Sequence, residues 1–143
     1  MNFNFSQSQQ DLYELVGYLA REHFAARAAQ ADAAQTLPLQ NLKDLQSHGL
    51  LGLTIARERG GMGSGVMGED PVLYLLAIEQ TARVDLSTAH CLHIHLHACH
   101  DETERAGRGG EQTGGIGSQN GAQVAEAVAQ VLAGLGVGAL GPQ

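Results

Sequence analysis

The sequence predicts an all-α protein, a small bundle of about four helices followed by a glycine-rich tail. Two observations support this prediction. Apolar residues in the first hundred positions recur at intervals of three and four, which is the period of a helix that buries one face. Residues that begin or end helices, such as Gly49 and the pair Asp70-Pro71, lie between these periodic stretches. At 143 residues the chain has room for one domain, or for one domain and a tail.

Two helices are predicted before residue 50. Residues 8–30 have an amphipathic pattern, with one stripe that contains Leu12, Leu15, Val16, Leu19 and Phe24. A second, short helix begins at Pro38, which suits a first helical turn because its missing N–H has no helical partner there. This helix continues to His48, and Gly49 is expected to end it in a left-handed conformation. Residues 50–55 are expected to be an extended segment or a connector.

Two further helices follow a glycine-rich loop at residues 59–68. Asp70-Pro71 supplies an acidic N-cap and a proline at the first helical position. The third helix is predicted from Val72 to about Arg83, and its inner face consists of Leu73, Leu76, Ala77 and Gln80. The fourth helix is predicted from about Thr88 to Glu104. It follows two residues that can cap a helix, Asp85 and Ser87.

The character of the sequence changes after Arg105. Residues 101–143 hold eleven of the nineteen glycines, and the few large apolar side chains there do not offset the backbone entropy that glycine loses on folding. We predict a folded domain at residues 1–105 and a low-complexity, mostly disordered tail at 106–143, with one weak helix at Gln123–Leu132. The abrupt change also suggests a truncated, fused or frame-shifted gene product.

Composition and charge exclude several classes of partner. The net charge is −7 with eight Lys and Arg and no basic run, so nucleic acids and anionic membranes are poor partners. No window reaches the ~18 continuous apolar residues of a membrane helix, and the N-terminal residues lack the pattern of a signal peptide. Cys91 and Cys99 lie too far apart along one straight helix for a disulfide. Reduced thiols are typical of a cytoplasmic protein.

The loop Gly63–Gly68 has the G-x-G-x-x-G spacing of a dinucleotide-binding loop. Such a site needs a strand directly before the loop and a second strand that ends in an acidic residue. Here Ala56–Arg59 and two further glycines separate the loop from the preceding apolar run, and the region after it reads as helix. We therefore interpret the segment as a loop between helices. Ser64 lies between glycines without the G-x-S-x-G pattern, so we expect no serine nucleophile.

Histidines form a stripe along the fourth predicted helix. They fall at steps of three, four and three and share one face: His90, His93, His97 and His100. His93 and His97 have the i, i+4 spacing that a metal ion needs, and an adjacent stripe contains Cys91, His95 and Cys99. We expect no metal, because no H-E-x-x-H or C-x-x-C motif supports one; the four-histidine stripe is the alternative. No oxyanion hole accompanies the cysteines, so we expect no cysteine nucleophile.

Two segments resemble the N-terminal helical domain of the acyl-CoA dehydrogenase family of flavoenzymes. The first is Gly49–Gly63, in which Gly-Leu-Leu-Gly-Leu precedes a connector and Gly-Gly-Met-Gly. The second is Glu79–Ala89, which matches the pattern Glu-x-x-Ala-Arg-x-Asp-x-Ser. The resemblance covers roughly residues 8–98. It implies a small helical bundle in front of a middle β-domain and a C-terminal helical bundle.

The resemblance also implies a function for the complete enzyme. FAD would lie between the middle and C-terminal domains, and the N-terminal helices would form part of the wall around an acyl-CoA chain. The catalytic base of most members comes from the C-terminal domain, so no catalytic residue is carried over to this chain. His93 and His97 are candidate pocket residues. Because they resemble histidines of the flavin-dependent monooxygenases with the same fold, both dehydrogenation and monooxygenation stay open.

The chain departs from the family pattern in two places. Ala56–Arg59 stands where the family often has Pro-Glu-Glu-aromatic, and no later segment matches the middle domain's Thr-Glu-x-x-x-Gly-Ser-Asp signature. We therefore expect the N-terminal portion of a flavoenzyme, inactive alone and without stably bound FAD. Its exposed apolar helix faces would self-associate or bind a partner chain. The alternative is a non-enzymatic helical interaction module, with zinc on the histidine helix.

Overall fold

The computed structural model describes residues 4–65 and 68–107 of the chain. These residues form helices and loops with no strand among them, so the predicted all-α class is confirmed. The predicted tail, with its weak helix at Gln123–Leu132, lies outside the described residues apart from the last turn of the final helix.

The first helical rod consists of three consecutive segments. Ser6 begins it with a capping box, and α1 (Gln7–Leu19) follows. A π-helical turn (Ala20–Phe24) and α2 (Ala25–Ala33) continue it. The helix predicted at residues 8–30 is confirmed, and the observed helical stretch, residues 7–33, is slightly longer.

The π-helical turn was not predicted, but its position has a physical reason. Leu19 and Phe24 are five residues apart, which in an α-helix places them about 140° apart around the axis. Both side chains are nevertheless buried, with exposed fractions of 2% and 0%. The wider π turn brings both toward the core.

The short helix α3 (Leu39–Ser47) follows Pro38, which is its N-cap rather than a residue of its first turn. Gly49 has a φ of 73°, so the predicted left-handed helix end is confirmed. Of the two alternatives for residues 50–55, an extended segment or a connector, the structure has the connector. The chain makes two 3-10 turns, at Leu50–Gly52 and Arg57–Arg59. The first of these turns buries Leu50 and Leu51 in the core, whereas the second contains no buried residue.

The last two helices begin at acidic caps, as predicted. Asp70 accepts a hydrogen bond from the backbone of α4 (Pro71–Ala82), which has the proline at its start. α5 (Leu86–Gly107) begins two residues before the predicted start. Of the two possible caps, Asp85 is the one used, because its carboxylate accepts the N–H of Ser87 at 3.0 Å. Ser87 itself lies inside the helix.

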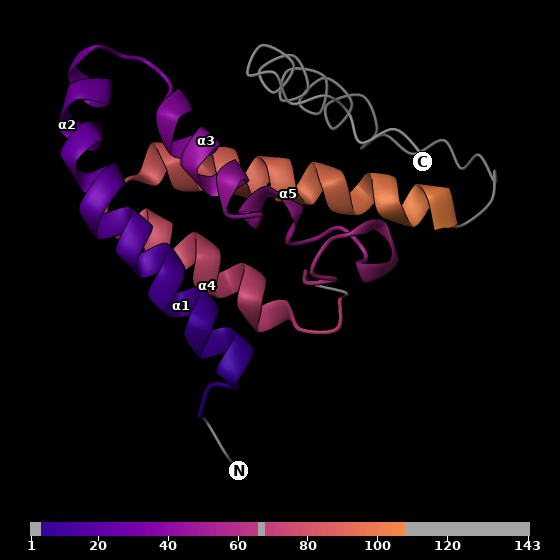
Figure 1. Cartoon of the computed structure of the whole chain (residues 1–143). Coiled ribbons are helices and arrows are strands. Elements are labelled where there is room, and N and C mark those ends of the chain that lie inside the picture. The colour runs from indigo at the N-terminus through magenta and orange to yellow at the C-terminus, as the bar shows by residue number, and fades with distance from the viewer. Residues whose placement is uncertain (1–3, 66–67, 108–143) are drawn as a thin grey trace.

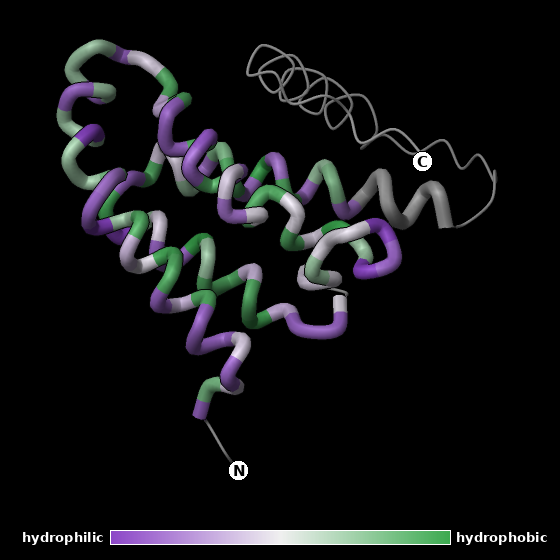
Figure 2. Tube along the Cα trace, viewed as in Figure 1, coloured by the Kyte–Doolittle hydropathy of each residue, from purple (hydrophilic) through white to green (hydrophobic). Residues whose placement is uncertain are grey.

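The helices form a bundle in which α1 lies beside α4, α4 packs on α5, and α3 packs on the first half of α5 (Figure 1). Hydrophobic residues gather where α1 and α4 face each other (Figure 2). The predicted inner face of α4 is confirmed, because Leu73, Leu76, Ala77 and Gln80 are all buried. In α5 the fully buried residues Leu92 and Leu96 occupy the centre of the core.

The glycine-rich loop folds back onto the segment before it. The N–H of Gly63 donates to the carbonyl of Ile55 at 2.8 Å, and the N–H of Ser64 donates to that of Leu53 at 2.8 Å. Gly61 lies so close to this segment that a Cβ atom there would stand 2.1 Å from the Ile55 oxygen. A side chain at position 61 would therefore separate the two segments.

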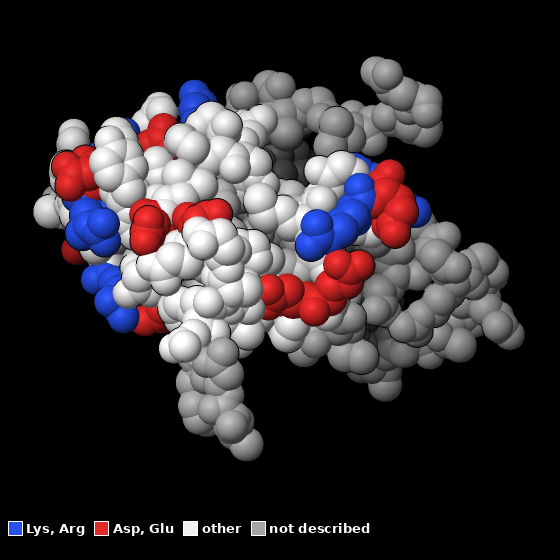
Figure 3. All heavy atoms as spheres, turned by 60° about the horizontal axis from the view of Figure 1, so that its bottom comes forward, with Lys and Arg blue, Asp and Glu red and all other residues white. Residues whose placement is uncertain are grey.

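Charged side chains form small mixed clusters rather than a field of one sign. On the face that Figure 3 shows, acidic and basic side chains lie close together in groups at the left and at the right, and mostly uncharged surface separates the two groups. The pairs Arg57–Glu69 and Arg83–Glu79 are salt bridges of 2.9 and 2.6 Å, and both are largely exposed. Water and salt screen such exposed pairs, so they contribute little to stability. No helix in the described ranges is long and apolar enough to cross a membrane.

Candidate functional site

The predicted histidine stripe lies on α5, and most of it faces solvent. His90, His93 and His97 are exposed, whereas His100 is partly buried. The rings of His93 and His97 stack with centroids 6.1 Å apart and planes 23° from parallel. The structure thus brings the two candidate pocket residues together.

Tyr74 on α4 orients this histidine pair. Its side chain is buried, with an exposed fraction of 6%, and its hydroxyl forms a short hydrogen bond with Nδ1 of His93. Burial raises the pKa of Tyr74, so the phenol keeps its proton at neutral pH. The sequence analysis missed Tyr74. The available signal was its position next to the predicted inner face of the third helix, one residue after Leu73 and three before Ala77.

The second stripe of α5 is turned toward the bundle. Nε2 of His95 donates a hydrogen bond to the carbonyl of Leu51 at 3.0 Å, and Sγ of Cys99 lies 3.5 Å from the same nitrogen. Burial lowers the pKa of His95, although the hydrogen bond to Leu51 acts in the opposite direction. Burial, and then the charge of Asp85, raise the pKa of the Cys91 thiol. A thiol with a raised pKa is a poor nucleophile at neutral pH.

A metal site with a full set of protein ligands is not found among the side chains of residues 4–65 and 68–100, which the structure describes. No three or more His, Cys, Asp or Glu side chains there could hold one ion. The stripe of His90, His93, His97 and His100 therefore does not form a four-ligand site in the described conformation. The two stacked histidines are the part of the stripe in which imidazoles come together.

A buried polar network joins α2, α3 and the start of α5. Asn41 is fully buried, and its amide donates to Asp85 at 3.1 Å and to the hydroxyl of Thr88 at 2.9 Å. Arg27 donates to the Asn41 carbonyl at 2.9 Å and forms a 2.6 Å salt bridge with Asp44. Among the described residues, every buried side-chain nitrogen and oxygen has a hydrogen-bond partner, as buried polar groups require.

The charge state of Asp44 reflects this network. Partial burial raises its pKa, but hydrogen bonds from Arg27 and Gln40 and the charge of Arg27 outweigh that effect and lower the pKa overall. The sequence analysis identified Asp85 as a cap but missed Asn41. The sequence feature that indicates this role is the position of Asn41, a polar residue four places before Leu45 on the apolar stripe of a short helix.

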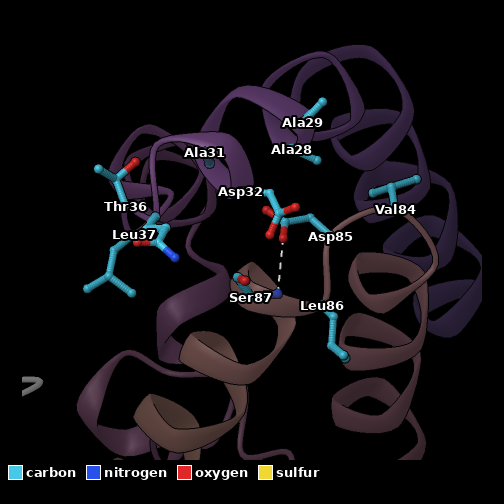
Figure 4. Close-up of a pocket in the computed structure, with 11 residues that line it drawn as sticks. Ala28, Ala29, Ala31, Asp32, Thr36, Leu37, Val84, Asp85, Leu86 and Ser87 are labelled. Atoms are coloured by element: carbon cyan, nitrogen blue, oxygen red, sulfur yellow. Dashed lines mark hydrogen bonds between the residues drawn. The ribbon is translucent and has the colours of Figure 1, made fainter.

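A pocket of about 650 Å³ opens between the end of α2 and the turn from α4 to α5. Asp32 and Asp85 point into it from opposite sides, as Figure 4 shows, and Leu37 and Leu86 line its rim. The two carboxylates disfavour anions, so this pocket does not suit the phosphates of a coenzyme A molecule. Asp85 is already engaged by Asn41, Thr88 and the helix backbone.

The G-x-G-x-x-G segment is a loop between helices, as interpreted from the sequence, although residues 66–67 within it lie outside the described ones. Ser64 is buried and holds the loop to α4. Its hydroxyl donates to the carbonyl of Asp70 at 2.6 Å and accepts the N–H of Tyr74 at 3.0 Å. These bonds occupy the hydroxyl and give Ser64 a structural role.

These features define a helical domain whose polar residues mostly stabilise the fold. The sequence model described as "Acyl-CoA dehydrogenase, N-terminal domain" matches residues 6–109, which is most of the chain. The chain belongs to the acyl-CoA dehydrogenase family through this N-terminal domain, and the predicted resemblance is confirmed.

Three curated relatives illustrate the match. The short-chain-specific acyl-CoA dehydrogenase of Clostridium acetobutylicum is 27% identical over 99 residues, which cover 69% of this chain and 25% of that protein. A probable acyl-CoA dehydrogenase of Bacillus subtilis is 32% identical over a segment that covers 62% of this chain and 22% of that protein. The acryloyl-CoA reductase (NADH) of Anaerotignum propionicum is 28% identical over a segment that covers 67% of this chain and 23% of that protein. The chain thus spans about a quarter of the length of these relatives. No solved structure matches it significantly.

Proposed function

We propose that this chain supplies the N-terminal helical part of an FAD-dependent oxidoreductase that acts on an acyl-CoA or a related substrate. The observation that supports this proposal is the family match over residues 6–109, which coincides with the described helical bundle. Relatives of this segment include a protein named a dehydrogenase and one named a reductase. The proposal therefore covers both directions of the acyl-CoA redox reaction, with monooxygenation as a further possibility from the resemblance.

In this proposal the helices form part of the wall around the acyl chain. His93 and His97 are the side chains that would face substrate or flavin. The flavin site and the catalytic base belong to other parts of the enzyme, so the chain alone binds no FAD stably and turns over no acyl-CoA. We also propose that residues 1–105 are the folded domain, residues 106–143 a separate tail, and the cytoplasm the location.

Several large apolar side chains are exposed on the described surface, and they favour a covering partner. Leu75 and Leu86 have exposed fractions of 59% and 73%. In the complete enzyme we expect other domains to cover such residues, whereas the isolated chain would self-associate. The non-enzymatic interaction module stays the alternative. Lack of activity in both the isolated chain and the chimeric enzyme described below would favour it.

The test compares the isolated chain with a chimeric enzyme. Residues 6–109 replace the matching segment of the Clostridium acetobutylicum relative, and both proteins are purified for visible absorption and anaerobic acyl-CoA titration. We expect the isolated chain to be colourless and inactive. The chimera should retain FAD, and acyl-CoA should bleach its flavin band. Stoichiometric FAD on the isolated chain would overturn the proposal, as would a folded, FAD-containing chimera whose flavin does not respond to acyl-CoA.

A further inference from the structure

His93 and His97 are the two imidazoles on α5 that combine exposure, helical spacing and ring stacking. Four residues of α-helix rise about 6 Å, which agrees with the 6.1 Å between the ring centroids. Two imidazole nitrogens on one tetrahedral ion, each about 2.0–2.1 Å from it, place their ring centroids about 5 Å apart. Because both side chains are exposed, the rings can rotate out of the stack until one nitrogen of each points to a shared ion. The centroid distance then shortens by about 1 Å, and the core is not disturbed.

Tyr74 already holds His93 in a position that suits coordination. The Tyr74 hydroxyl is hydrogen-bonded to Nδ1 of His93, so the other ring nitrogen of His93, Nε2, makes no hydrogen bond to Tyr74. A histidine that binds a metal through one nitrogen usually donates the proton of the other nitrogen to a nearby acceptor, which fixes the ring. A neutral tyrosine hydroxyl can accept that proton as readily as it can donate one.

The surroundings also favour a cation. The sequence from Leu86 to His100 contains no Lys or Arg, so this part of α5 carries no fixed positive charge, and the whole chain has a net charge of −7. A cation bound there therefore meets no fixed positive charge on the Leu86–His100 part of the helix.

We infer that His93 and His97 form a two-histidine site for a divalent transition-metal ion, with Tyr74 as its positioning residue. Imidazole ligands suit Cu²⁺, Ni²⁺ and Zn²⁺, and Cu²⁺ binds such a site most tightly of these. With two protein ligands, the ion keeps its remaining positions for water or another ligand. The site does not depend on the proposed flavoenzyme function.

The experiment titrates the metal-free 143-residue chain with Cu²⁺ and follows the titration by calorimetry and by electron paramagnetic resonance. His93→Gln and His97→Gln each remove one ligand. His90→Gln is the matched control, because His90 is an exposed histidine of the same helix outside the stacked pair. Circular dichroism checks that the helices are retained in every variant.

We expect each of the two pair variants to weaken Cu²⁺ binding by about tenfold or more, and His90→Gln to change it by less than about threefold. The spectrum of the wild-type chain should show two coordinated nitrogens, and Tyr74→Phe should weaken binding through the loss of the Nδ1 partner. Equal losses in all three histidine variants would mean dispersed binding and would overturn the site. No loss in the pair variants would overturn it too.

Discussion

Asn41 illustrates how one residue holds distant parts of the chain together. Its amide bonds to Asp85 and Thr88, 44 and 47 residues further along the chain, and its carbonyl accepts a hydrogen bond from Arg27. These partners of the Asn41 side chain all come from other segments of the chain. Such a residue joins α2, α3 and α5 more specifically than apolar contacts do, because each bond requires a particular geometry.

Replacing Asn41 by alanine should therefore cost more stability than its size suggests. Asn41→Ala leaves Asp85 and Thr88 with fewer partners in a buried site, and we expect the free energy of unfolding to fall by about 2–3 kcal/mol. Urea denaturation followed by circular dichroism measures this loss. Gln40→Ala is the control, because Gln40 is the exposed neighbour and its side chain donates to Asp44 at the surface; it should change stability by less than about 0.5 kcal/mol. Equal effects of the two variants would contradict the role of the network.

At the scale of elements, α3 ends at a glycine whose conformation other residues rarely adopt. Gly49 has a φ of 73°, and a Cβ atom there would meet nothing within 4 Å. Gly52, three residues later, has equally open surroundings but an ordinary negative φ. The two positions therefore separate backbone strain from steric crowding.

This pair gives a direct test of the helix end. Gly49→Ala should lower the free energy of unfolding by about 1–2 kcal/mol, because an L-residue is strained in the left-handed region. Gly52→Ala should be neutral or stabilising by up to about 1 kcal/mol, because it restricts only the unfolded chain. Thermal and urea unfolding of both variants provide the measurement. A Gly49→Ala variant as stable as the wild type would show that the turn relaxes at no cost.

At the scale of the whole molecule, α5 is the element on which the bundle is built. It packs against α4, α3 and the turn at Leu50–Gly52. The hydroxyl of Thr54 also donates to the carbonyl of Leu96 at 2.7 Å, which joins the connector after α3 to the middle of α5. A loss of packing in the middle of α5 should therefore affect the entire fold.

Two leucines test this expectation. Leu96 is fully buried, whereas Leu75 on α4 has an exposed fraction of 59%. Leu96→Ala should lower the free energy of unfolding by about 2–5 kcal/mol, and Leu75→Ala by less than about 0.5 kcal/mol. Hydrogen exchange of backbone amides should report faster exchange in every helix of Leu96→Ala. Faster exchange in α5 alone would indicate that the bundle is not one cooperative unit.

The sequence was sufficient where a feature depends on residues close together in the chain. The caps at Asp70 and Asp85, the helix end at Gly49 and the inner face of α4 each follow from patterns within a few residues. The family match followed from two such patterns, around Gly49–Gly63 and Glu79–Ala89, and it is confirmed.

Only the tertiary structure decided which of the polar residues meet. The pairing of Tyr74 with His93, the engagement of Asn41 with Asp85 and the bond from His95 to Leu51 join residues separated by 19 to 44 positions. Helical periodicity places a side chain on a face, but the packing of one helix on another selects its neighbour. For this reason the sequence by itself determined the helices, their ends and the family of this chain, and the packed bundle determined which histidines are exposed, stacked or partly buried.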